Sequence, residues 1–76
     1  MTTDEQISVF CNNVKFLRKK HGLSKKEMAK RLHIGVRMLS KLESGIVSDR
    51  LGADILVWIH MEFGILPSQQ FLPLEE

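Results

Sequence analysis

The sequence predicts an all-α fold, a compact bundle of four to five short helices in which two helices form a helix-turn-helix. Apolar residues recur at spacings of three and four residues, the period of one helix face, and no segment shows the alternation of a strand. Glycines follow the apolar stripes where helices would end. The joint between the second and third stripes is short and contains a glycine, which favours crossed helices over a long hairpin.

The first helix is expected over residues 3–21. Two capping boxes fit its start equally well, Thr3 with Gln6 and Thr2 with Glu5. The pair His21-Gly22 then ends it. The side that faces the core is predicted from an apolar stripe formed by Ile7, Phe10, Val14 and Leu17.

The helix-turn-helix is predicted over residues 24–45. Its first helix runs from Ser24 to Leu32 and begins with a capping box between Ser24 and Glu27. Its second helix runs from Val36 to Ser44 and ends at Gly45, since glycine adopts the left-handed conformation at little cost. The residues expected to face the core are Met28, Leu32, Leu39 and Leu42, and Ala29 is small enough to let the two helices approach closely.

A fourth helix is expected after a loop at residues 46–49. Either Ser48 or Asp49 can cap it, and Gly64 follows its end at about residue 63. The tail, residues 65–76, is expected to pack on this helix, with a short helical turn from Pro67 through Phe71.

The fourth helix has almost no polar face. Its core stripe is predicted to be Leu56, Ile59 and Phe63, which leaves Trp58 and Met61 on another face. An exposed apolar pair of this size indicates burial against the first helix, the tail or a second subunit. Trp58 and Met61 are therefore a candidate dimer interface.

Size and charge limit the classes of function. A chain of 76 residues predicts a single domain, residues 1–76. All eleven Lys and Arg lie between Lys15 and Arg50 beside three acids, whereas residues 51–76 carry four acids and no cation. A basic half favours a polyanionic partner, although a solvated surface explains charge alone equally well. No membrane span or signal peptide is recognisable, and the single Cys11 is expected to be a buried hydrophobe, so we expect a cytoplasmic protein.

Residues 14–64 resemble the phage-repressor/Cro type of helix-turn-helix, also called XRE-like, which has the lambda-repressor-like fold. The family's small residue in the first motif helix is matched by Ala29, and the residues that end its recognition helix are matched by Glu43-Ser44-Gly45. The family also pairs this acid with an Arg late in the first helix, which implies an ion pair between Arg18 and Glu43. The family's apolar positions are matched by Met28, Leu32, Ile34, Leu39 and Leu42.

The chain departs from the family pattern in three places. His33 stands where the family prefers a Gly in a left-handed turn, and His tolerates that conformation better than most residues. Gly35 replaces the Ser or Thr that caps the recognition helix. The loop at residues 46–49 is apolar and acidic where relatives often carry cations.

The resemblance implies a sequence-specific transcription regulator, of repressor type and acting as a homodimer, that binds double-stranded DNA. Its recognition helix, about residues 36–44, would lie in the major groove. Arg37 is best suited to reading guanine, because a guanidinium can donate to both major-groove acceptors of that base. The implied base-reading residues are Val36, Arg37, Ser40 and Lys41, and the implied phosphate contacts are Lys25, Lys26 and the backbone N–H groups near Ser44.

A function of another class stays open. The same fold could serve as a protein-interaction or antitoxin-like module that acts on a protein partner through the apolar surface around Trp58. An enzyme is not expected, because the three histidines lack ligand-like spacing, Cys11 has no evident base and no glycine-rich phosphate loop is present. No metal and no cofactor are expected.

Overall fold

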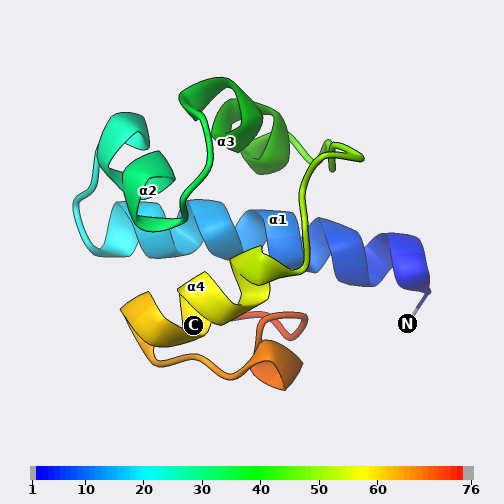
Figure 1. Cartoon of the computed structure of the whole chain (residues 1–76). Helices are drawn as coiled ribbons and strands as arrows, with labels where there is room; N and C mark the ends of the chain where they lie inside the picture. The colour runs from blue at the N-terminus through cyan, green and yellow to red at the C-terminus, as the bar shows by residue number, and fades with distance from the viewer. Residues whose placement is uncertain (1, 75–76) are drawn as a thin grey trace.

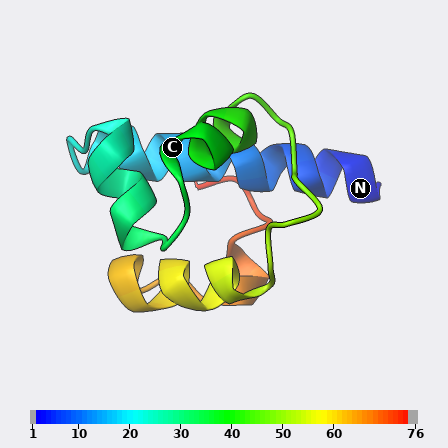
Figure 2. The same cartoon turned by 45° about the horizontal axis from the view of Figure 1, so that its top comes forward.

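The computed structural model describes residues 2–74, and these residues form helices and loops without a strand. The elements are α1 (Thr3–Lys20), α2 (Lys25–Arg31), α3 (Val36–Glu43), α4 (Asp54–Phe63) and a 3₁₀ turn, η1 (Pro67–Gln69). In Figure 1, α2 and α3 lie above the long helix α1, and α4 and the tail lie below it. The turned view in Figure 2 shows the loop after α3 descending beside this stack to the start of α4. The predicted all-α class is confirmed.

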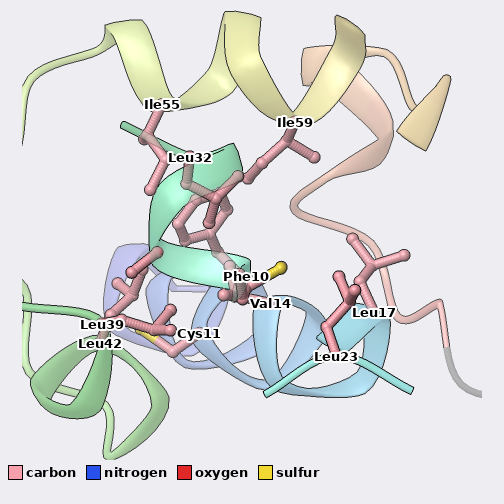
Figure 3. Packing of buried hydrophobic residues seen from close by; sticks show 12 residues of the cluster. Phe10, Cys11, Val14, Leu17, Leu23, Leu32, Leu39, Leu42, Ile55 and Ile59 are labelled. Atoms are coloured by element: carbon pink, nitrogen blue, oxygen red, sulfur yellow. The ribbon is translucent and has the colours of Figure 1, made fainter. Parts of the chain in front are cut away.

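One hydrophobic core joins all four helices. Figure 3 shows Ile55 and Ile59 pointing from α4 toward Leu32 and Phe10, and Leu39 lying on the α3 side of the core. Burying each such side chain stabilises the fold by about 1.5–3 kcal/mol. The core residues contributed by the four helices and their flanks are Phe10, Cys11, Val14, Leu17, Leu23, Met28, Ala29, Leu32, Leu39, Leu42, Ile55 and Ile59. Nearly all the predicted core positions of the first three helices are therefore buried, and Ile7 packs at the edge.

Local signals account for the starts of α1 and α2. Thr2 caps α1 by accepting a hydrogen bond from the Glu5 backbone N–H, which decides between the two candidate boxes. At the start of α2 the Ser24 hydroxyl accepts from the Glu27 N–H, and the Glu27 carboxylate accepts from the Ser24 N–H. These bonds lower the pKa of the Glu27 carboxyl, because they favour its charged form.

Cys11 lies in the core between α1 and α3 with 2% of its surface exposed. Desolvation raises the pKa of its thiol, so the sulfur stays protonated near neutral pH. Its expected role as a small buried hydrophobe agrees with this position.

The start of the fourth helix was predicted too early. Neither Ser48 nor Asp49 caps it, because α4 begins at Asp54 after Ala53, which makes no side-chain cap. The Ser48 hydroxyl instead accepts from the Arg50 N–H, and its carbonyl accepts from the Leu51 N–H, so a turn forms in its place. The loop therefore extends from residue 44 to residue 53.

The predicted core stripe of the fourth helix is partly wrong. Ile59 is buried as expected, but the second buried residue is Ile55, while Leu56 and Phe63 are half-buried at the margin. Because the helix begins later than predicted, its first two turns pack on the core. Its buried face is therefore centred on residues 55 and 59. Phe63 instead lies under the His21 ring, with the ring centroids 5.0 Å apart.

Two buried amides hold the tail in place. The Asn13 amide nitrogen donates to the carbonyls of Gln70 and Leu72, and its oxygen accepts from the Leu74 N–H. The Gln70 amide nitrogen donates to the carbonyls of Leu56 and Ile65. The tail thus contacts α1 as well as the expected α4, and the Phe71 ring stacks on Phe10. Its helical turn ends at Gln69, before the expected Phe71.

Candidate nucleic-acid interface

The outer face of α3 is exposed and carries cations. Leu39 and Leu42 turn toward the core, so the opposite side of this two-turn helix faces solvent. Val36, Arg37 and Lys41 are exposed there, and Ser40 is half-buried between them. Three of the four predicted base-reading residues are therefore open to solvent, and Ser40 is partly covered.

The only acid of α3 is removed from this surface by an ion pair. The Arg18 Nε donates to Glu43 Oε2 at 2.7 Å, and its Nη2 donates to Oε1 at 3.0 Å. A third donation, from Nη1 to the Leu23 carbonyl, ties the same guanidinium to the loop after α1. The two side chains are only 15% and 5% exposed, so they are held between α1 and α3. Hydrogen bonding to Glu43 raises the pKa of Arg18, which keeps the guanidinium charged.

The start of α2 lies against one side of the α3 surface. The Lys25 Nζ is 3.4 Å from the Ser40 hydroxyl, which links the first turn of α2 to the middle of α3. Lys26 is exposed beside it. The two short helices lie next to each other in Figure 2, and the contact of Lys25 with Ser40 brings the start of α2 to the rim of the α3 surface.

The backbone N–H groups of residues 44–46 close the end of α3. The N–H groups of Ser44, Gly45 and Ile46 donate to carbonyls of the last turn of α3. The Ser44 hydroxyl also donates to the Ser40 carbonyl. Gly45, at φ +90°, closes the helix by this means. The expected phosphate contact near Ser44 stays a prediction, and it would have to share these N–H groups with the bonds that close the helix.

Arg50 is a cation of this surface that sequence reasoning missed. It lines a hollow on the side of α3 away from α2, together with Arg37, Lys41 and Ser48. The predicted helix start at residue 48 or 49 had placed Arg50 inside the fourth helix, whereas it lies in the loop. The departure from the family pattern at residues 46–49 is therefore offset by a cation one position later.

The joint between α2 and α3 contains the one non-glycine residue of the described chain with a positive φ, His33 at +58°. This conformation costs about 1–2 kcal/mol for a residue with a Cβ. The His33 ring stacks on the Trp58 ring of α4, with centroids 3.8 Å apart and planes inclined by 26°. Trp58 was expected to find cover on the first helix, the tail or a second subunit; the joint covers one face of its ring and leaves it half-buried, and the dimer interface of Trp58 and Met61 stays a prediction. The apolar surface left open on α4 is Val57, 51% exposed, and Met61, 68% exposed.

Residues 14–57, more than half of the chain, match the family model described as helix-turn-helix. The chain belongs to the XRE-like helix-turn-helix family, a family of DNA-binding transcription regulators. No curated protein and no solved structure matches the chain. Within residues 2–74, none of the helices has the length and apolar character that crossing a membrane requires.

Proposed function

We propose that this chain is a sequence-specific, repressor-type transcription regulator that inserts α3 into the major groove of double-stranded DNA. One observation carries the proposal. The outer face of α3 presents two cations without an acid, because Glu43 is turned inward and bound by Arg18. Cations on the neighbouring rims, Lys25 and Lys26 on one side and Arg50 on the other, widen the same positive surface.

Arg37 reads bases in this arrangement. It lies in the first turn of α3, the part of a recognition helix that approaches base edges most closely. A bidentate contact to guanine is worth about 1–3 kcal/mol of discrimination against other bases. Val36, 43% exposed one residue earlier, can contact a thymine methyl. Ser40 and Lys41 complete the reading surface one turn further along.

The rim cations contact the two sides of the groove. Lys25 and Lys26 neutralise phosphates next to the start of α2, and Arg50 neutralises a phosphate on the opposite side. Phosphate contacts position the protein without reading sequence. Their combined contribution depends on salt, because each neutralised phosphate releases condensed counterions.

Selection from a random duplex pool tests the proposal. The bound fraction should converge on a defined site, and its affinity should fall with salt at a log–log slope of about −0.9 per phosphate contact. A pool that never converges would remove sequence specificity. An affinity that does not change with salt would contradict the proposed phosphate contacts as well.

The same selection tests a dimer. A homodimer of this family should select a two-fold symmetric site whose half-sites are separated by about 34 Å or a multiple of it. An unsymmetric single half-site would indicate binding as a monomer.

The second candidate function, a protein-interaction or antitoxin-like module, has a smaller surface than the sequence suggested. Trp58 is stacked on His33, so an apolar partner would have to bind through Val57 and Met61. Association of that kind responds weakly to salt, which separates it from DNA binding. The two functions can coexist on one chain, because α3 and the open part of α4 are different surfaces.

A further inference from the structure

We propose that His33 is a positioning residue for DNA recognition: its ring, stacked on Trp58, holds the joint of the helix-turn-helix against α4 and so fixes how α3 is presented. The inference rests on the proposed DNA-binding function and names a residue that would not itself touch the duplex. His33 has no place among the base-reading or phosphate-contacting residues described above.

The backbone at His33 is the first observation. A left-handed residue is required here, and glycine would adopt this conformation without strain. Histidine in its place adds strain and supplies a ring. Strain of this sort persists only where surrounding contacts hold it, so the ring contact gives it a physical reason.

The ring contact is the second observation. The two rings lie nearly parallel with a centroid separation of 3.8 Å, which is close for an aromatic pair. The contact joins α4 to the joint between α2 and α3. The last residue of this joint, Gly35, immediately precedes α3. Movement of the joint relative to α4 would therefore move the start of α3, where Arg37 lies.

The third observation is that no side chain caps the start of α3. Gly35 provides no side-chain cap, so the first N–H groups of α3 lack the local bond that a Ser or Thr would supply. The ion pair between α2 and α4, Arg31 with Glu62, is 3.6 Å long, and its side chains are 46% and 36% exposed. An exposed ion pair of that length adds little. The stack thus adds a ring contact between the joint and α4 to the apolar packing of Leu32 and Ile34 on the core.

Loss of the ring should act on base reading more than on phosphate contacts. Base reading requires Arg37 to lie in one narrow geometry, whereas a phosphate contact tolerates a shift of the helix. His33→Asn is the sharpest variant, because Asn adopts left-handed backbone but carries no ring. His33→Gly removes the ring and the strain together, so it should fold even if the Asn variant does not. His21→Asn is the matched control, since His21 also contacts a ring of α4, Phe63, but at the far end of that helix.

The experiment measures two quantities for each variant. Acrylamide quenching of Trp58, the only tryptophan of the chain, reports whether the ring is covered. Affinity for the selected duplex and for a random-sequence duplex reports positioning. His33→Asn and His33→Gly should both increase the quenching and lower affinity for the selected duplex about threefold to tenfold, with less change for the random duplex. His21→Asn should leave both quantities near wild type.

Changes at Trp58 complete the test. Trp58→Leu should reproduce the loss, and combining it with His33→Asn should add nothing further, because both remove the same contact. Trp58→Phe keeps a ring and should retain most of the affinity. Unchanged quenching in the His33 variants would show that the stack is absent in solution and overturn the inference. An increase in quenching without any loss of affinity for the selected duplex would overturn the positioning role alone. A wild-type chain that binds neither duplex would overturn the proposed function, and the positioning role with it.

Discussion

Two parts of the molecule use their polar side chains in opposite ways. The motif half is residues 24–50, and the α4–tail half is residues 51–74. In the motif half most cations point outward, and the one acid of α3 is bound internally by Arg18. In the α4–tail half the decisive polar group, Gln70, is buried and bonds backbone carbonyls, while Asn13 of α1 holds the same tail from the other side. The first half keeps charge available for a partner, and the second half uses hydrogen bonds to close a small core.

This difference indicates where stability and function are separable. Substitutions of buried polar groups should lower the free energy of unfolding, whereas substitutions on the outer face of α3 should change binding alone. Arg18 belongs to both categories, because it neutralises the nearly buried Glu43 and keeps that acid away from the outer face of α3.

Arg18→Met should have the largest effect. It leaves the carboxylate of Glu43 nearly buried without its partner, and the free energy of unfolding should fall by about 3–5 kcal/mol. Urea denaturation followed by circular dichroism measures this loss. Lys19→Met, at an exposed neighbouring position, is the control and should change little. The double variant Arg18→Met/Glu43→Leu should recover much of the stability, and no recovery would show that the charge of Glu43 was not the cause.

Asn13→Ala should rank second. It removes three hydrogen bonds to the tail and leaves buried backbone groups without partners, so the free energy of unfolding should fall by about 2–3 kcal/mol. Gln6→Ala, at an exposed position of the same helix, is the comparison and should lose less. Affinity for the selected duplex should stay unchanged where both variants are folded. A loss of affinity would mean that the two halves are not separable.

Arg37→Ala tests the outer face of α3, where a substitution should change binding and not the free energy of unfolding. The side chain is exposed, so the free energy of unfolding should stay within about 0.5 kcal/mol of wild type. Preference for the selected duplex over a random one should fall by about 1–3 kcal/mol, measured by competition binding. Arg50→Ala should instead weaken both duplexes similarly and make the salt slope shallower by about one unit. If Arg37→Ala kept full preference, Arg37 would not read bases.

Acidification should produce the smallest effect, confined to the start of α2. The folded-state pKa of Glu27 lies below its ordinary value, so its contribution is complete above that value and is lost as pH falls through the folded pKa. Wild type should therefore melt at a higher temperature than Glu27→Gln near neutral pH, and the difference should shrink below about pH 4.3. A difference that is constant down to pH 3 would mean that the capping carboxylate contributes nothing through its charge.

The first three helices were predictable because their signals are local. The Ser24–Glu27 box, the stripe of α1 and the glycine after α3 each act within a few residues, and the predicted bounds agree with the structure to within about one residue. The start of α4 was not predictable in this way. Ser48 has the chemistry of a helix cap, and only the folded loop shows that its hydroxyl bonds the Arg50 N–H instead.

Contacts between distant residues could not be predicted from the sequence. Asn13 and its tail partners are 57 to 61 residues apart, and an Asn on a helix carries no mark of such a role. The stack of His33 on Trp58 was missed for the same reason, and Trp58 was consequently assigned to an open surface. The ion pair of Arg18 with Glu43 was expected only through the family resemblance. The base-reading role of α3 stays a prediction, because the structure gives its exposure and charge but no partner.

A nuclear magnetic resonance titration of the chain with the selected duplex tests that role most directly. Backbone amide signals should shift at residues 25 and 26, at residues 36–41 and at residue 50, while those of residues 57 and 61 stay in place. Shifts centred on residues 57 and 61, with the α3 signals unchanged, would contradict it.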